Sequence, residues 1–279
     1  MSVLPDTSVD LTAVARQLRR HVVRMSHEGR APHLGSSLSC IDILVAAYWD
    51  TLKIDPASPD DPDRDRFILS KGHAAAALYA TLAERGFFPS EELAEYNCAG
   101  SRFPEQPSPG AVPGVEAATG SLGHGLSLGL GMALAARIQN RSYRVMAVVS
   151  DGECNEGTVW EAAMFAAAQQ LDNVAVVVDY NRWQATGRSE EIMAIDPMID
   201  KWKAFGWATA SVDGHDIDRL VEQFNQLPLQ SGRPSAIVAR TTKGKGISFM
   251  EDDNNWHYRI PNEDELQAAL AELDGDSDA

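Results

Sequence analysis

Two residues whose side chains can offer oxygen atoms to a metal stand thirty positions apart, and each comes just after an apolar segment of the chain. Asp151 comes soon after the apolar run 145–149, and Asn181 comes soon after the run 174–178. Uninterrupted runs of this kind are typical of strands buried on both faces, and the Ala-rich segment 158–170 between them has the composition of a helix. Together they predict two parallel strands with a right-handed crossover. If the strands are neighbours, a carboxylate and an amide converge on one small cation, and Mg²⁺ suits such ligands.

Glycines near these residues favour an anion at the same place. Gly152 lets a ligand approach the backbone, and the Gly-rich segment 119–127 opens a predicted helix whose N-terminus attracts phosphate. Each pattern is weak by itself, because Asp-Gly turns and Gly-rich helix starts are common. An ordinary βαβ unit with a turn Asp and a turn Asn therefore stays open as an alternative at this point.

Three histidines stand in predicted loops. His73 follows a short predicted strand, 66–69, and ligands of open α/β sheets bind at the carboxyl ends of strands. His33 lies in a Pro- and Gly-containing turn, and His257 lies in a late loop. A histidine in a turn is more often incidental than catalytic, so the turn alone does not assign a role to His33.

Composition narrows the class of protein. The chain has 279 residues and a net charge of −16, with 40 acidic and 24 basic residues. This charge argues against binding to nucleic acid or to anionic lipid. The three cysteines have no metal-binding spacing, so we expect free thiols in a reducing cytoplasm, with Cys154 a bystander. The N-terminal residues lack the pattern of a signal peptide, and no apolar stretch is long enough to predict a membrane span.

The remaining elements complete an α/β domain with helices on both faces of a mostly parallel sheet. We expect further helices at 10–29, 39–49, 74–85 and up to about 227, with strands at 207–212 and 235–240. We expect a disordered tail over 1–9, one domain over 10–273 and an acidic tail over 274–279. Ser37 or Ser39 is a candidate N-cap for the second helix. Lys243 and Lys245 are interpreted as part of a flexible basic loop and are not counted as catalytic.

The string from Asp151 to Asn181 resembles the thiamine-diphosphate motif, which opens with Gly-Asp-Gly and closes at an Asn about 30 positions on. Residues 151–162, Asp-Gly-Glu-x-x-Glu-Gly-x-x-Trp-Glu-Ala, are similar to its transketolase form, as is Ser-Lys-Gly-His at 70–73. Ser150 stands where the motif has its first Gly, and we expect this small residue to be tolerated.

The resemblance to transketolase covers nearly the whole chain, but only the first third to half of a full-length transketolase. It therefore implies a thiamine-diphosphate-binding fold and the N-terminal subunit of a split, two-subunit enzyme. Such an enzyme transfers a two-carbon ketol unit from a ketose, which can be phosphorylated, to an acceptor sugar. The partner would be the C-terminal subunit, which binds the aminopyrimidine, in an α₂β₂ heterotetramer. Nucleic acid and membrane are not expected as partners.

The resemblance also implies roles for individual residues. The metal, Mg²⁺ or another divalent cation such as Ca²⁺ or Mn²⁺, would be held by Asp151, Asn181 and the backbone carbonyl of Trp183. The cofactor would be contacted by Leu122, Gly123, Gly152 and His73, together with the metal ligands. The catalytic residues would be His33, His73, His257 and Glu156, the histidines facing the donor and the glutamate coupling two cofactors at a subunit interface.

Besides Ser150, the sequence departs from the family pattern at three further positions. His124 replaces the usual Gln of the Gly-rich string, and His257 is followed by Tyr258 where split members have Gly. Gln106 stands where ordinary transketolases carry a histidine that touches the donor, which makes it a candidate substrate residue. An amide does not take up a proton near neutral pH, so we expect a specialised ketol transferase.

Two alternative functions stay open. The α subunit of a ketoacid dehydrogenase shares the cofactor motif, although the Lys-Gly-His and Trp-Glu-Ala strings weigh against it. A non-catalytic regulatory homologue would keep the fold, although the intact Asp151, Asn181, His33 and His73 argue against it. The sequence does not identify the donor or the acceptor.

Overall fold

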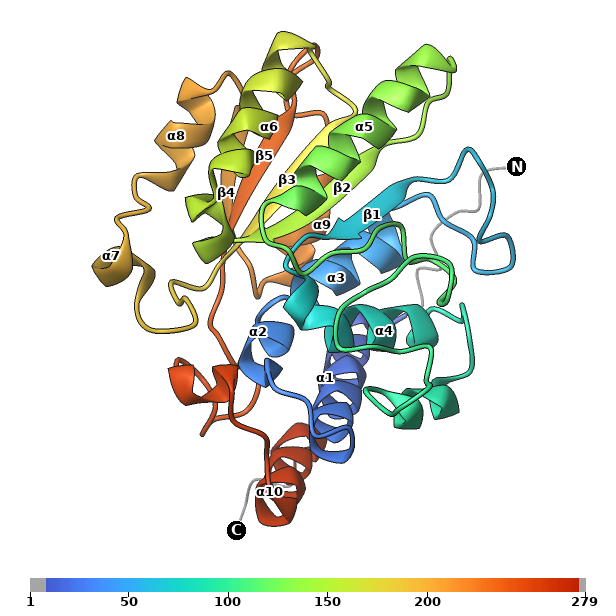
Figure 1. Ribbon diagram of the computed structural model, residues 1–279, viewed down its shortest axis with the longest axis vertical. Coiled ribbons are helices and arrows are strands. Elements are labelled where there is room, and N and C mark those ends of the chain that lie inside the picture. The colour runs from blue at the N-terminus through green and yellow to red at the C-terminus, as the bar shows by residue number, and fades with distance from the viewer. Residues whose placement is uncertain (1–8, 276–279) are drawn as a thin grey trace.

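The computed structural model describes residues 9–275, and its centre is a five-stranded parallel sheet in the order β1-β2-β3-β5-β4 (Figure 1). The strands are β1 (Arg66–Leu69), β2 (Val145–Ser150), β3 (Val174–Tyr180), β4 (Ala208–Asp213) and β5 (Ser235–Arg240). The predicted sheet is confirmed, and all four of its pairings are parallel.

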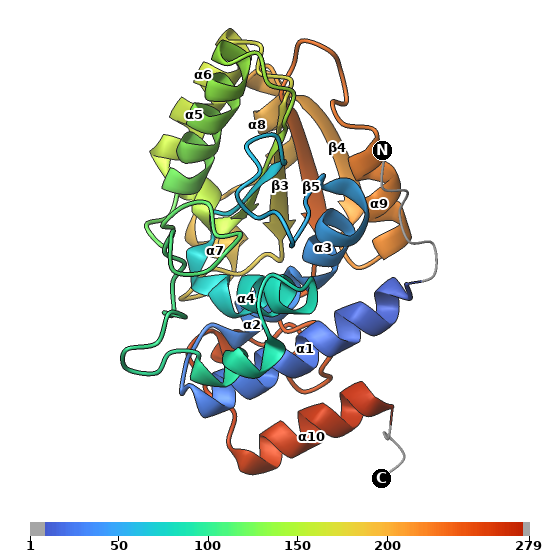
Figure 2. The same ribbon diagram turned by 90° about the vertical axis from the view of Figure 1, so that its right-hand side faces the viewer.

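Helices lie in two layers against the sheet and in a third group beyond its carboxyl edge (Figure 2). One face is covered by α5 (His124–Ile138), α6 (Gly157–Ala168) and α8 (Met198–Ala204), and the other by α3 (Ile41–Ala46) and α9 (Ile217–Asn225). The third group consists of α1 (Leu11–Glu28), α2 (Leu34–Ser39), α4 (Ala75–Glu84) and α10 (Glu263–Asp274). The shorter elements are a π turn (Ala47–Thr51), α7 (Ser189–Ile192) and the 3₁₀ turns η2 (Gly72–Ala74), η3 (Ser90–Glu95), η4 (Gly152–Asn155) and η5 (Asn254–His257).

Alternation along the strands divides the core into two clusters. Met146 and Val148 of β2 pack into the cluster that contains α1, α3 and α4. Val145, Ala147 and Val149 point the other way, into the cluster that contains α5, α6 and α8. Successive side chains of a strand point to opposite faces, so an uninterrupted apolar run supplies both layers.

The helix expected over 39–49 corresponds to α3 and the π turn, which together run over 41–51, and the sequence analysis missed the short α2 before them. The structure has α2, then α3, then the π turn, with a break at Cys40. The expected serine N-cap is absent, because the N-cap of α3 is Cys40, which makes no side-chain cap, and Ser37 and Ser39 lie within α2. The helix α2 begins after His33, which has a left-handed backbone (φ 70°) and makes no side-chain cap. The backbone N–H of His33 donates instead to His257 O (2.7 Å), so a distant loop fixes the start of this helix.

The helix α10 was not predicted. It begins with a capping box in which Asn262 and Glu265 satisfy each other's backbone N–H groups. Leu266, Leu270 and Leu273 are buried, and the helix packs on α1. The predicted tails fall largely outside the described residues, since the structure describes nothing before residue 9 or after residue 275. Among helices of the described part, none has the length and apolar character needed to cross a membrane.

Candidate active site

Asp151 and Asn181 occupy the carboxyl edge of the sheet, past the ends of two neighbouring strands. β2 and β3 pair in register up to Ser150 and Asp179, and the N–H of Asp151 adds a further hydrogen bond to Asp179 O (3.3 Å). Both Asp151 and Asn181 are buried. The adjacency of the two strands, which the sequence predicted, therefore places both ligand types at one edge.

Asp151 has unused acceptor capacity. Its Oδ2 accepts a hydrogen bond from Ser189 Oγ (2.7 Å), whereas its buried Oδ1 has no hydrogen-bond partner among the described residues. Burial raises the pKa of this carboxyl to about 7. An uncompensated buried carboxylate is unfavourable unless it is paired or coordinates a metal, so the donor set at this position fits a divalent cation.

The amide of Asn181 is oriented by its neighbours. Its Nδ2 lies 3.3 Å from Ser39 Oγ and 3.5 Å from Asp179 Oδ2, and its Oδ1 accepts from the N–H of Trp183 (3.0 Å). Within residues 9–275, no group of three or more His, Cys, Asp or Glu residues is arranged to hold a metal. A cation here would therefore need the Asn181 amide, a backbone carbonyl and ligand oxygens in addition to Asp151.

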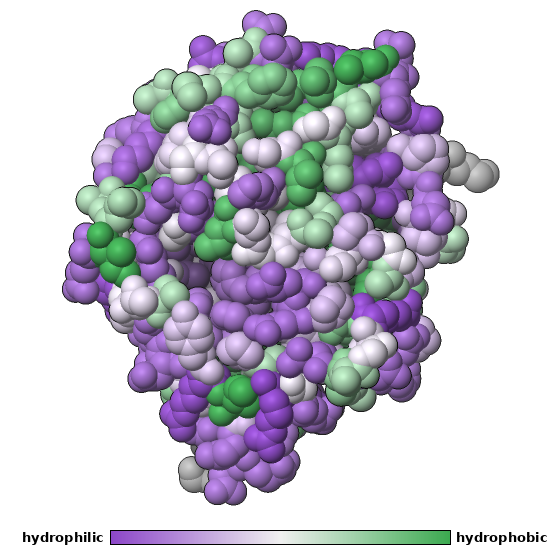
Figure 3. All heavy atoms as spheres, viewed as in Figure 1, coloured by the Kyte–Doolittle hydropathy of each residue, from purple (hydrophilic) through white to green (hydrophobic). Residues whose placement is uncertain are grey.

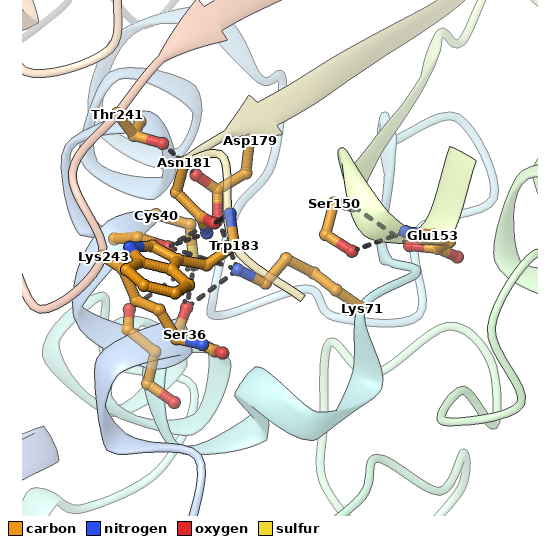
Figure 4. A network of polar contacts seen from close by, with 12 residues as sticks. Ser36, Cys40, Lys71, Ser150, Glu153, Asp179, Asn181, Trp183, Thr241 and Lys243 are labelled. Atoms are coloured by element: carbon orange, nitrogen blue, oxygen red, sulfur yellow. Dashed lines mark hydrogen bonds and ion pairs between the residues drawn. The ribbon is translucent and has the colours of Figure 1, made fainter. Parts of the chain in front are cut away.

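A buried ion pair that the sequence analysis missed supports this edge of the sheet (Figure 4). The ammonium of Lys71 contacts Asp179 Oδ2, and neither side chain is exposed. Lys71 also donates to Ser36 O (2.8 Å), while Asp179 accepts from Ser39 Oγ (2.6 Å) and from Thr241 Oγ1. Burial alone would raise the pKa of Asp179, but the ammonium and the hydrogen bonds hold this pKa below its usual value.

The three candidate histidines come together. The ring centroid of His33 lies 5.3 Å from that of His73 and 5.0 Å from that of His257, and the last two rings are 5.8 Å apart. Burial lowers the pKa of His33, lowers that of His73 well below its usual value and lowers that of His257 to about 3. All three imidazoles are therefore neutral at pH 7, when each can both donate and accept a hydrogen bond.

Lys243 belongs to this cluster, so its interpretation as part of a flexible basic loop is wrong. Its side chain is buried, and its Nζ donates to Asn254 Oδ1 (2.7 Å) and lies 2.9 Å from His257 Nδ1. Burial, with the nearby ammonium of Lys71, lowers the pKa of Lys243 to about 7. Lys245, by contrast, is partly exposed and pairs with Glu251 (3.0 Å).

The Gly-rich segment meets β2 through a second missed residue, Glu153. Gly123 caps α5 with φ 83°, and its N–H donates to the buried Glu153 Oε1 (2.8 Å), so this N–H is already used. Ser150, which stands where the motif has its first Gly, accepts a hydrogen bond at its Oγ from the N–H of Glu153 (3.1 Å). The serine side chain therefore helps to hold this turn. Leu122 is half-buried beside Gly123, and Gly152 begins η4.

Glu156 and Gln106 are both exposed, each beside a glycine of the Gly-rich segment. Glu156 is exposed at the N-cap of α6, and its Cβ lies 2.8 Å from the position that a Cβ on Gly123 would take. Gln106 is exposed, and its amide packs against Gly120. The preceding residue, Glu105, does reach the cluster, with its Oε1 2.9 Å from His33 Nδ1 but without hydrogen-bond alignment.

Two further residues have no evident part in the site. Burial raises the pKa of Cys154 well above its usual value, so this thiol is not ionised, as expected of a bystander. His124 is exposed on the first turn of α5, where its Nδ1 lies 3.2 Å from Leu122 O.

Comparison with known proteins relates this geometry to one family. Residues 10–277 match the family described as "Transketolase, thiamine diphosphate binding domain". The chain is 38% identical over 255 residues to a protein of Phocaeicola vulgatus named as one subunit of apulose-4-phosphate transketolase, covering 91% of this chain and 90% of that protein. It is 40% identical over 271 residues to the 6-deoxy-6-sulfo-D-fructose transketolase subunit SqwG of a Clostridium species, covering 97% and 98%.

Solved transketolase structures also match nearly all of this chain, but the match covers less than half of those longer proteins. Transketolase from Leishmania mexicana superposes with a TM-score of 0.90 at 26% identity, covering 95% of this chain and 41% of that one. Transketolase from Campylobacter jejuni gives 0.88 at 29%, covering 95% and 42%. The chain thus spans about two fifths of these transketolases but nearly all of the two proteins named as subunits.

Proposed function

Because this chain belongs to the transketolase family and corresponds to its N-terminal, thiamine-diphosphate-binding part, we propose that it is one subunit of a two-subunit ketol transferase. The pair would move a two-carbon unit from a ketose donor to an acceptor sugar. The observation that carries the proposal is the buried Asp151 carboxylate at the end of β2, which has one oxygen without a partner among the described residues.

The proposal assigns the cation to Asp151, Asn181 and the backbone carbonyl of Trp183, with Mg²⁺ as the expected ion. Gly152 and the segment at Leu122 and Gly123 would lie along the diphosphate. Thiamine diphosphate, when bound, supplies the nucleophilic carbon that ketol transfer requires. The contribution of this chain is to hold the cofactor and to exclude water from its charged end.

The neutral histidine cluster would handle the hydroxyl groups of the sugar. His33, His73 and His257 have rings 5.0 to 5.8 Å apart, and all three are neutral at pH 7. A neutral imidazole can accept a proton from one hydroxyl while donating a hydrogen bond to another oxygen. We add Lys243 to this group, because its amine lies 2.9 Å from His257 Nδ1.

We propose that the partner is the C-terminal, pyrimidine-binding subunit, in an α₂β₂ assembly located in the cytoplasm. Two relatives that match nearly full length are named as subunits, which supports a separate partner chain. The outer surface of α5 and α6 also exposes Leu128, Met164 and Phe165. Figure 3 shows apolar residues over the upper part of this face, where Figure 1 places these helices. Apolar surface of this kind is typical of a protein interface.

The proposed donor is a specialised ketose rather than a common intermediate. The two relatives are named for apulose 4-phosphate and 6-deoxy-6-sulfo-D-fructose. Gln106 also replaces the family's histidine in the loop that carries Glu105 to His33. The names of the relatives support an uncommon ketose donor, and Gln106 supports a donor that needs no imidazole at this position.

Reconstitution tests the proposal. The purified chain, with thiamine diphosphate and Mg²⁺, should be inactive alone and should transfer ketol units after addition of the pyrimidine-binding subunit from the same genome. Sedimentation should show two copies of each chain. Turnover by the isolated chain would contradict the need for a partner. Decarboxylation of a 2-ketoacid without ketol transfer would favour a ketoacid dehydrogenase subunit, and a pair that binds no cofactor would favour the regulatory homologue.

A further inference from the structure

The loop after β3 closes on itself through Trp183 and Arg188. These two residues form an isolated antiparallel bridge, and the N–H of Gln184 donates to Gly187 O (2.9 Å). The guanidinium carbon of Arg188 lies 3.7 Å from the centre of the Trp183 ring, at cation–π distance. The loop therefore has a compact shape set by its own side chains.

Asp252 ties this loop to a distant one. Its two carboxylate oxygens accept from the two Nη atoms of Arg188 (2.7 and 2.5 Å), and its Oδ1 also accepts from Trp183 Nε1 (2.8 Å). The backbone of Asp252 is left-handed (φ 58°), and its N–H donates to Lys243 O (2.8 Å). Asp252 thus joins the loop after β3 to the loop that holds Lys243 and His257. We call Trp183, Arg188 and Asp252 the clasp.

The loop held by the clasp touches both side chains at the proposed cation position. At its start, the N–H of Trp183 donates to Asn181 Oδ1 (3.0 Å). At its end, Ser189 Oγ donates to Asp151 Oδ2 (2.7 Å). Fixing the backbone of a residue costs conformational entropy, so a loop that is already ordered binds a cation more tightly than one that orders on binding.

The geometry of the clasp differs from that of an ordinary surface ion pair. Exposed pairs contribute little, except where an Arg and a carboxylate meet in a two-point arrangement or several charges form a network. Arg188 and Asp252 meet at two points, and an indole both stacks on the cation and donates to the carboxylate. Among the described residues, Arg182 in the same loop pairs with Glu190 alone, through one nitrogen and with no aromatic ring on it. Asp252 is about as exposed as these two side chains, but Arg188 is only 26% exposed.

We propose that Trp183, Arg188 and Asp252 are positioning residues, which hold the loop after β3 in its cation-binding shape before any cation arrives. This inference rests on the proposed function, since it concerns the same cation and cofactor. The inference gives a role to side chains that would touch neither the cation nor the cofactor, and it links the affinity for the cation to the loop that holds Lys243 and His257.

The test compares Arg188→Met with the matched control Arg182→Met, which removes the same charge from the same loop. Calorimetric titration of Mg²⁺ into the reconstituted pair with thiamine diphosphate measures affinity. Hydrogen exchange of residues 183–189 in the chain without cation measures order. We expect Arg188→Met to weaken Mg²⁺ binding about tenfold or more, the loss expected if one loop residue must be ordered on binding, and to speed exchange in this loop. Arg182→Met should match the wild type in both measurements, and a cooperative urea transition should show that both variants are folded.

A second variant keeps the inference testable if Arg188→Met fails to fold. Asp252→Asn removes the charge, and Asn tolerates the left-handed backbone as Asp does; it should give the same two effects. Equal affinity and equal exchange in the wild type and the clasp variants would overturn the inference. A wild-type pair that binds no Mg²⁺ with thiamine diphosphate would instead defeat the proposed function, so the two failures are distinguishable.

Discussion

Replacement of Lys243 by Met should change how the stability of the chain depends on pH. The Lys243 side chain is 1% exposed, and burial together with Lys71 lowers its pKa from 10.5 to about 7 in the folded protein. A shift of that size corresponds to roughly 5 kcal/mol at about 1.4 kcal/mol per pKa unit. Burial of Lys243 therefore lowers the free energy of unfolding at every pH at which the unfolded chain keeps this residue protonated.

The sign follows from the protons bound in each state. Between pH 7 and 10.5 the unfolded chain retains the Lys243 proton and the folded chain has released it, so this group makes stability rise with pH. From pH 7 to pH 9 the wild type should gain about 2 kcal/mol relative to Lys243→Met, which lacks the titrating amine. Below pH 7 both states are protonated, and the difference between the two proteins should be constant.

Urea unfolding of the chain without cofactor at pH 7, 8 and 9 measures this difference. Subtracting the variant from the wild type at each pH cancels the other groups that titrate. Lys245→Met is the control, because this nearby lysine is partly exposed and pairs with Glu251; its curve should run parallel to that of the wild type. A difference between wild type and Lys243→Met that stays flat or falls from pH 7 to 9 would refute the reasoning.

Three other substitutions give separate predictions. Lys71→Met should destabilise the chain by roughly 3–5 kcal/mol, because it leaves the Asp179 carboxylate buried without its partner. The double variant Lys71→Met with Asp179→Leu should recover most of this loss in thermal unfolding, and equal melting temperatures of the single and double variants would contradict this. Asp151→Ala should abolish Mg²⁺-dependent binding of thiamine diphosphate in the reconstituted pair and leave the fold intact, and undiminished affinity in calorimetry would exclude the assignment. Gln106→His should speed transfer from xylulose 5-phosphate to ribose 5-phosphate by ~10²–10⁴ if a proton is shared there, and fast wild-type turnover unaffected by the substitution would count against specialisation.

The sheet could be predicted because its signals are local. β2 and β3 are uninterrupted apolar runs, and the helix between them fixes their direction and handedness. Asp151 and Asn181 could be chosen for the same reason, since each directly follows one of these strands. The helix α10 also has a local signal in the sequence, because Asn262 and Glu265 have the spacing of a capping box and precede Leu266.

The environment of Lys243 could not be predicted, because distant parts of the chain create it. A Thr-Thr-Lys-Gly-Lys-Gly string has the composition of a loop, and the burial of its first lysine depends on Gly35, Asn254 and His257. The pairing of Asp179 with Lys71 spans 108 positions. One signal was available even so: Asp179 is a charged residue inside an apolar strand, and a buried charge requires a partner.

The complete burial of α2 has a consequence for anyone who wishes to redesign the specificity of this enzyme. All six of its residues are buried, Ser39 is shared between Asp179 and Asn181, and a Cβ on Gly35 would come within 3.2 Å of Lys243. Few substitutions at positions 34–39 should therefore be tolerated in a combinatorial library. A library should instead vary exposed loop positions such as Gln106 and Tyr258, where new side chains extend into solvent. The fraction of library members that remain folded should be far higher at those two positions than along α2.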